Sequence, residues 1–179
     1  MRLFIGYLII AGIMAGKPAV RADQTFTSGP ARVALLELFS SEGCSSCPPA
    51  EQWLGQFRNR PELWRKVVPV AWHVNYWDRL GWQDIYASKS FTARQYAYAK
   101  LWGARSVYTP GFALNGREWR RGEDMSLSTT AGGLLEVVWH ENKTAFITYT
   151  PPDDSHHLDY NVTITLLGGN ITSDVLAGE

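Results

Sequence analysis

Two cysteines three residues apart are the side chains whose type and spacing could do chemistry. They form the stretch Cys44-Ser45-Ser46-Cys47, which is followed by Pro48-Pro49. Proline is favoured in the first turn of a helix, so the pattern predicts a Cys-x-x-Cys pair at a helix N-terminus. The unpaired N–H groups and the positive end of the helix dipole there favour a thiolate. We expect Cys44 to be the exposed nucleophile with a modestly lowered thiol pKa, and Cys47 to resolve the mixed disulfide.

The same two cysteines have two other uses. In an oxidising compartment they could form an inert structural disulfide. They could also bind a soft metal such as copper together with His73. The chain has no second Cys-x-x-Cys, which excludes a four-thiolate zinc site within one chain. The other histidines are His140, His156 and His157.

Two further features are candidates for the same site. The Thr109-Pro110 bond precedes a short strand and the hairpin signal Asn115-Gly116, which is a reasonable position for a cis peptide, although spacing alone leaves cis and trans equally open. A cis turn would expose the Thr109 backbone to an extended substrate. His73 stands at the end of a predicted strand, where it is either a proton carrier for the thiols or a simply hydrogen-bonded residue. We expect Asp84 and Arg94 to make local ion pairs.

The hydrophobic pattern supplies the elements that must position these residues. Apolar runs predict buried strands at 33–39 and 67–74, the second weakened by Pro69. A helix begins at Pro48, and another spans 91–102 and ends at Gly103. After residue 122 the predicted strands are 134–140, 144–150 and 161–167, following a polar leader at 23–30. The chain therefore divides into an α/β domain of about 31–125 and a β-rich extension of 126–179.

These motifs resemble a known family. The stretches LELFSSEGCSSCPPAE, AWHVNYWDRLGWQD, SFTARQYAYA and VYTPGFALNGR are similar to the bacterial exported family called domain of unknown function 1223, which is grouped with thioredoxin-like proteins. The resemblance covers roughly residues 33–179 and implies a thioredoxin-like fold. It matches Cys44 and Cys47 to the redox pair and Pro110 to the cis-proline of that superfamily. The two residues between the cysteines, Ser45 and Ser46, differ from the pairs found at these positions in the well-studied oxidoreductases. The resemblance also implies a truncated extension, because family members continue past the position of residue 179.

The N-terminus predicts export. Arg2 is followed by an uncharged apolar run over 3–16, and Val20 and Ala22 fit a cleavage site before Asp23, which is typical of a signal peptide at 1–22. The alternative is a retained membrane anchor, but the run is shorter than the roughly 20 residues that span a bilayer. Without this segment and its three basic residues, 14 basic and 17 acidic residues remain, a net charge of −3. We expect a periplasmic or secreted protein with no stable membrane span and no nucleic-acid partner.

The preferred function is exported thiol–disulfide exchange on a protein or small-molecule disulfide or thiol, with no cofactor beyond the two thiols. Cys44 attacks, Cys47 resolves and Thr109-Pro110 positions the partner. Whether the protein is an enzyme stays open. The alternatives are a copper-binding chaperone and a non-enzymatic binding module with a structural disulfide and an aromatic ligand surface. The aromatic residues that form either this surface or a core are Trp72, Tyr76, Trp77, Trp82 and Trp102.

Overall fold

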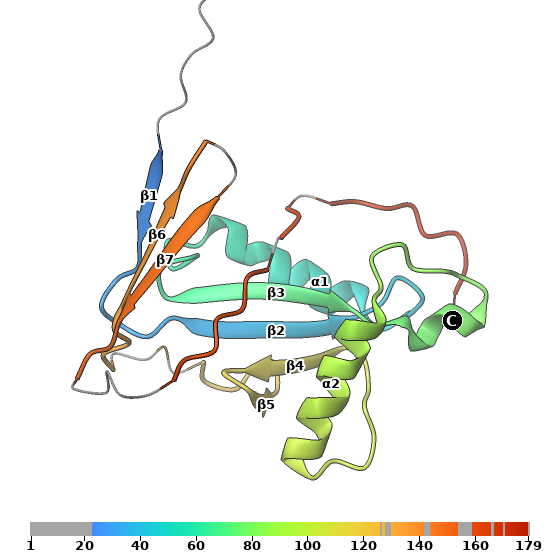
Figure 1. Ribbon diagram of the computed structural model, residues 1–179. Helices are drawn as coiled ribbons and strands as arrows, with labels where there is room; N and C mark the ends of the chain where they lie inside the picture. The colour runs from blue at the N-terminus through green and yellow to red at the C-terminus, as the bar shows by residue number, and fades with distance from the viewer. Residues whose placement is uncertain are drawn as a thin grey trace, which may run out of the picture.

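The chain forms a mixed α/β structure with two separate sheets, seen in a computed structural model (Figure 1). It describes residues 23–125, 127, 130–141, 144–153, 159–165, 167–169 and 171–178, so the predicted signal peptide lies outside the described residues. The elements in chain order are β1 (Gln24–Thr27), β2 (Ala34–Ser40), α1 (Pro48–Gly55), the 3-10 helix η1 (Gln56–Asn59), β3 (Val67–His73), the 3-10 helix η2 (Asn75–Leu80), α2 (Lys89–Trp102), β4 (Gly111–Leu114), β5 (Arg117–Trp119), β6 (Leu134–Trp139) and β7 (Ala145–Thr150).

The central sheet has the strand order β3-β2-β4-β5. Strands β2 and β3 run parallel, with Ser40 opposite His73. Strand β4 is antiparallel to both β2 and β5, and places Gly111 opposite Phe39. Because β3 is an edge strand, the missing N–H of Pro69 is tolerated there. The carboxyl ends of β2 and β3 and the start of β4 therefore meet at one edge of the sheet.

Strand β2 is buried on both faces, as its continuous apolar run predicted. Leu36 and Leu38 pack in a cluster with Ala50 and Phe57 from α1 and η1. Phe39 belongs to a second cluster, into which aromatic residues of β3, η2 and α2 pack. Figure 1 shows α1 and α2 on opposite sides of the sheet. A strand covered on both faces needs apolar side chains at successive positions, which explains the absence of alternation.

Glu37 is the one charged residue in this buried run, and it is fully buried. Its carboxylate accepts hydrogen bonds from the Trp72 indole (2.8 Å), the Arg94 guanidinium (2.6 Å) and the Tyr98 hydroxyl (2.6 Å). Burial and the neighbouring Glu37 carboxylate raise the pKa of Tyr98 to about 12. The expected local ion pair of Arg94 is therefore wrong, since its partner lies 57 residues away in sequence. This cluster fastens α2 to the sheet.

The second sheet has the order β1-β6-β7 and differs from the predicted extension in two respects. Strand β1 lies in the stretch expected to be a polar leader and pairs antiparallel with β6. The predicted strand 161–167 is wrong, because its described residues, 161–165 and 167, have no strand structure. Val162 and Ile164 are exposed there, and alternation makes a strand only where a neighbouring edge supplies hydrogen bonds. None of the helices in the described part of the chain is long and apolar enough to cross a bilayer.

The Glu37 cluster gives a stability prediction. Glu37→Ala leaves the Arg94 charge, the Trp72 indole and the Tyr98 hydroxyl without their acceptor, and we expect a loss of about 3–5 kcal/mol in the free energy of unfolding. The matched control is Glu118→Ala, which removes an equally short hydrogen bond from a tyrosine hydroxyl, that of Tyr108 (2.6 Å), at an exposed position. Urea unfolding followed by tryptophan fluorescence measures both, and similar losses for the two variants would contradict the positioning role of Glu37.

Candidate functional site

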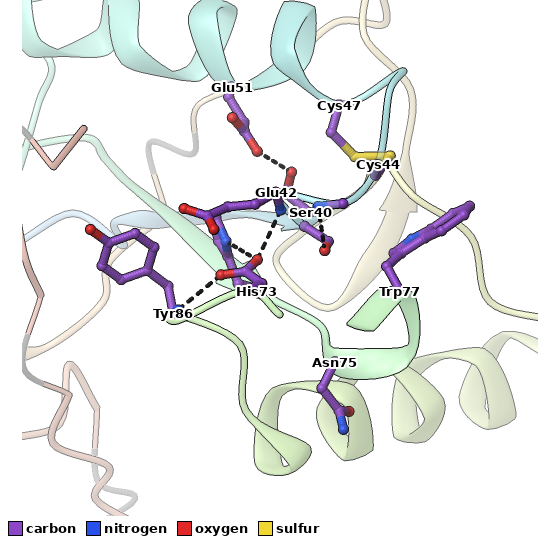
Figure 2. A network of polar contacts seen from close by, with 12 residues as sticks. Ser40, Glu42, Cys44, Cys47, Glu51, His73, Asn75, Trp77 and Tyr86 are labelled. Atoms are coloured by element: carbon purple, nitrogen blue, oxygen red, sulfur yellow. Dashed lines mark hydrogen bonds and ion pairs between the residues drawn. A yellow bond between two sulfur atoms is a disulfide. The ribbon is translucent and has the colours of Figure 1, made fainter. Parts of the chain in front are cut away.

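The two cysteines form a disulfide at the start of α1 (Figure 2). The chain leaves β2 at Ser40, turns through residues 41–43 and reaches Cys44, whose Cα lies 5.5 Å from that of Cys47. Cys47 is the N-cap residue of α1, and Pro48 and Pro49 occupy its first turn. The predicted order of buried strand, Cys-x-x-Cys and helix is confirmed.

The expected exposure of Cys44 is wrong. Cys44 is 1% exposed and Cys47 is 0% exposed, whereas Ser45 and Ser46 between them are exposed. Neighbouring segments pack closely here. A Cβ atom added at Gly43 would lie 3.3 Å from the Cβ of Trp77, and one added at Gly178 would lie 3.0 Å from the Cα of Gly43. This close packing of the turn buries both sulfur atoms, whereas Ser45 and Ser46 remain exposed.

The helix start supplies fewer N–H donors than the sequence argument assumed. Pro48 and Pro49 have no N–H, and the next two amides, those of Ala50 and Glu51, donate to the carbonyl oxygen of Cys47. The Glu51 carboxylate in the first turn also offsets the positive end of the helix dipole. Stabilisation of a thiolate at Cys44 therefore depends on side-chain donors more than on the helix backbone.

Thr109 supplies such a donor. The Thr109-Pro110 bond is cis, as the family resemblance implied. The Thr109 hydroxyl oxygen accepts a hydrogen bond from the Trp77 indole (2.7 Å), which can only donate, and the hydroxyl donates in turn to the Cys44 Sγ (3.2 Å). The Ser46 hydroxyl lies 3.5 Å from the same sulfur. Trp77 thus orients the Thr109 hydroxyl toward Cys44, a role that sequence reasoning missed because the two residues lie 32 positions apart.

The backbone around the cis bond is also tightly packed. A Cβ atom at Gly111 would lie 2.8 Å from the carbonyl oxygen of Tyr108, so glycine is required where the chain enters β4. The same carbonyl oxygen accepts a hydrogen bond from the Gln95 amide of α2 (2.7 Å). Helix α2 therefore holds the loop that carries Thr109.

His73 lies at the end of β3, opposite the residue that leads into the cysteine turn. Its Nδ1 is 2.6 Å from Asp84 Oδ2, and Asp84 also accepts hydrogen bonds from the backbone N–H groups of Glu42 and Tyr86. Burial alone would lower the pKa of His73, but the hydrogen bond to Asp84 and the charges of Asp84, Glu51 and Glu42 raise it above its ordinary value. Burial would raise the pKa of Asp84, but the hydrogen bonds from His73 and from these backbone groups lower it.

The pairing of His73 with Asp84 was not foreseen. Asp78 lies closer to His73 in sequence, but it accepts a hydrogen bond from the Asp84 backbone N–H instead. A buried acid such as Asp84, which is 4% exposed, needs several donors, and β3, the turn after β2 and the loop after η2 each supply one. No local sequence signal distinguishes the two aspartates.

Two more acids complete this side of the site. The Ser40 hydroxyl donates to Glu51 in a very short contact. The Trp82 indole donates to Glu42 Oε2 (2.8 Å), and Glu42 Oε1 is buried without a hydrogen-bond partner in the described part of the chain. Figure 2 shows Ser40, Glu42 and Glu51 grouped with His73 beside the turn that carries the disulfide. The negative charges of the two glutamates disfavour a thiolate at Cys44.

A cavity of about 970 Å³ opens beside the disulfide. Its wall includes Cys44, Glu42, Glu51, His73 and Tyr86, together with residues of the segment 167–178. The aromatic residues proposed as a ligand surface lie elsewhere. Those that pack against the second core cluster as partly buried residues are Trp72, Tyr76, Trp77 and Trp102. Of the two roles considered for these residues, the four rings therefore have the core role.

The metal alternative finds no support in the geometry. Among the described residues no three His, Cys, Asp or Glu side chains are grouped so that they could hold an ion. His140 instead contacts Asp23 (2.7 Å) in the second sheet. The remaining candidates, His156 and His157, lie outside the described residues.

Comparisons with known proteins identify a family. One solved structure, a crystal structure of a protein from Agrobacterium tumefaciens determined as a structural genomics target, is similar to this chain at 44% sequence identity with a TM-score of 0.45. The match covers 51% of this chain and 40% of the other. No curated protein matches. The model of the family described as "protein of unknown function (DUF1223)" matches residues 35–162. The chain therefore belongs to this family, whose description assigns no activity.

Proposed function

We propose that this protein catalyses thiol–disulfide exchange through Cys44 and Cys47, in a thioredoxin-like domain of about residues 31–125. The observation that carries the proposal is the environment of one sulfur atom. Cys44 Sγ accepts a hydrogen bond from Thr109, which belongs to a cis Thr-Pro pair, and Cys44 lines a large cavity whereas Cys47 does not. A structural disulfide needs neither a donor oriented toward one sulfur nor an adjoining cavity.

The order of elements supports the thioredoxin-like assignment. A buried strand leads into the cysteine pair and α1, a parallel strand follows, and the cis Thr109-Pro110 bond precedes the β4–β5 hairpin. This is the order that the family resemblance implied. The chain brings the cysteine turn and the cis peptide together across 65 residues of sequence.

The exchange reaction transfers two electrons. In the reduced protein the Cys44 thiolate attacks one sulfur of a substrate disulfide, forms a mixed disulfide and releases the other substrate sulfur as a thiolate, which takes up a proton. The Cys47 thiolate then attacks Cys44 Sγ, which restores the protein disulfide and releases the second substrate thiol. In the reverse direction a substrate dithiol attacks Cys44 and leaves as a disulfide.

His73 is the proposed proton carrier for these steps. It lines the same cavity as Cys44, and its Nδ1 is held by Asp84, so that Nε2 is the nitrogen left to exchange a proton. The raised pKa of His73 favours the protonated ring more than in an ordinary histidine. Asp84 fixes the ring orientation and does not itself touch the sulfur.

A second candidate function rests on the burial of both sulfur atoms. At 1% and 0% exposure the disulfide resembles a structural crosslink, which favours a non-enzymatic binding module. The two proposals differ in one property: an exchange protein must form a mixed disulfide at Cys44, whereas a structural crosslink does not. We further propose that the protein is exported to the periplasm or secreted, where disulfides persist.

Trapping tests the choice between these functions. In Cys47→Ser the mixed disulfide at Cys44 cannot be resolved, so incubation with an oxidised model peptide should yield a stable covalent adduct, detected by mass spectrometry and reversed by dithiothreitol. The matched control is Cys44→Ser, in which the remaining Cys47 does not line the cavity and should form no adduct. Equal trapping by both variants, or by neither, would support the structural disulfide.

The Thr109 hydroxyl gives a second prediction. Thr109→Val keeps the side-chain shape but removes the hydrogen bond to Cys44 Sγ, so the midpoint pH of Cys44 alkylation in the reduced protein should rise by about one unit. Trp77→Phe should cause a smaller rise, because the hydroxyl stays but loses its orientation. Thr148→Val, on an exposed strand of the second sheet, is the control and should leave the midpoint unchanged. An unchanged midpoint in Thr109→Val would remove this residue from the mechanism.

The His73–Asp84 pair gives a pH prediction. Because the pKa of His73 is raised in the folded protein and that of Asp84 is lowered, the pair stabilises the fold between these two values. The contribution of His73 is complete below the ordinary pKa of histidine and is lost as the pH rises through the raised value. That of Asp84 is complete above the ordinary pKa of aspartate and is lost as the pH falls through the lowered value. Unfolding of oxidised protein in urea should therefore show a larger loss for His73→Gln at about pH 5.5 than at about pH 8.5.

The control for this measurement is His140→Gln. His140 contacts Asp23 at 2.7 Å, but both side chains are more exposed than those of the buried pair. We expect a smaller pH dependence of the loss in this variant, because water screens an exposed pair. A loss in His73→Gln that did not change with pH would mean that folding does not shift the pKa of His73, which would contradict its ionic pairing with Asp84.

A further inference from the structure

A groove smaller than the cavity lined by Cys44 lies on the other side of the turn that carries the two cysteines. It has a volume of about 330 Å³ and is bounded by the first turn of α1, the Tyr108–Pro110 loop and the end of β5. Ser46, the exposed residue between the two cysteines, is part of its wall, as is the cis Pro110. A chain lying in this groove would pass next to the disulfide.

The groove has an apolar floor. Phe112 and Trp119 line it and are 7% and 6% exposed, and their rings pack edge to face. Both rings also contact Trp53 of α1 from below. The floor is therefore a rigid part of the core, able to accept one apolar side chain without rearrangement.

The rim of the groove is cationic. Arg120 and Arg121 are exposed and line it, and among the described residues neither forms a salt bridge to a carboxylate. Arg121 Nη1 donates to the carbonyl oxygen of Pro49 (3.2 Å), which holds that guanidinium against the first turn of α1. The nearest acids in sequence are already bonded, since Glu118 accepts from the Tyr108 hydroxyl and Glu123 from the Arg120 backbone N–H.

The charge therefore differs between the two sides of the disulfide. The cavity wall mixes acidic Glu42 and Glu51 with basic Arg58 and His73, whereas the groove wall carries Arg120 and Arg121 and no carboxylate. An anionic substrate is therefore attracted more strongly to the groove side. This asymmetry gives the disulfide a preferred direction of approach.

We infer that the groove binds an extended polypeptide segment in which the reacting cysteine is flanked by an apolar residue and an acidic residue. The apolar side chain covers Phe112 and Trp119, and the carboxylate pairs with Arg120 and Arg121. This inference rests on the proposed exchange reaction and specifies its substrate. The segment supplies the disulfide that Cys44 attacks, with the electron balance given above, and leaves as a free thiol.

Three model peptides test this substrate class. Each carries Leu next to a cysteine bonded through a disulfide to neutral thiopyridine, and they differ only in one neighbouring residue, which is Glu, Gln or Lys. Release of thiopyridone by the reduced protein gives second-order rate constants. We expect the Glu peptide to react about 3- to 10-fold faster than the Gln peptide, and the Lys peptide to react more slowly than the Gln peptide. Both ratios of rate constants should approach one at high salt, because salt screens the charges.

Substitution of the two groove arginines tests whether the preference for the Glu peptide arises in the groove. Arg120→Gln with Arg121→Gln should bring the Glu-to-Gln ratio close to one, and Arg120→Gln alone should lower it in part without disturbing the bond to Pro49. The control is Arg117→Gln with Arg105→Gln, two exposed arginines outside the groove, which changes the net charge equally and should leave the ratio unchanged. A ratio that both double variants changed equally, or that neither changed, would overturn the inference.

A binding measurement separates this result from failure of the proposed function. Peptides with Ser in place of the cysteine are titrated into the oxidised protein, with tryptophan fluorescence as the signal. If no peptide reacts faster with the wild type than with Cys44→Ser, the exchange function fails. Tighter binding of the Glu peptide that depends on Arg120 and Arg121 would then still support the groove as an acidic-peptide site, whereas equal binding of all three peptides would overturn it.

Discussion

The parallel pairing of β2 with β3 is the constraint on which the rest of the structure depends. It places Ser40 opposite His73, so the cysteine turn after β2 and the histidine that ends β3 lie at the same edge of the sheet. The pairing cannot slip, because both faces of β2 are buried. A shift by one residue would move Glu37 from its three donors into the apolar cluster under α1.

Glu37 connects the middle of this sheet, through α2, to the site at its edge. It holds Arg94 and Tyr98 of α2, and the same helix carries Gln95, which holds the Tyr108 carbonyl group beside Thr109. A buried charge with a full set of hydrogen bonds specifies one position for a helix, because any other position leaves the charge unpaired. The distance between the Thr109 hydroxyl and the Cys44 sulfur thus depends on a carboxylate in the core.

The environment of Cys44 contains opposing effects. Pro48 and Pro49 remove two helix amides, and the acids of the large cavity disfavour negative charge, whereas the Thr109 hydroxyl and the positive end of α1 favour it. The balance of these terms decides whether the disulfide exchanges or only crosslinks. The same geometry gives the disulfide a wall of mixed charge on one side and a cationic groove on the other, which is the basis of the proposed charge selectivity.

The sequence by itself determined the cysteine pair at a helix start, the buried strand β2, the position of β3, α2 and the β4–β5 hairpin, because these depend on local spacing, proline and glycine positions and continuous apolar runs. The predicted burial of β3 was only partly correct, since β3 is an edge strand. The family resemblance added the cis Thr109-Pro110 bond, which spacing left undecided. Only the tertiary structure decided the burial of Cys44, the partners of His73 and Glu37, and the pairing of β1 with β6. Each of these joins residues distant in sequence, and hydrogen-bond partners of buried polar groups are chosen by packing rather than by proximity along the chain.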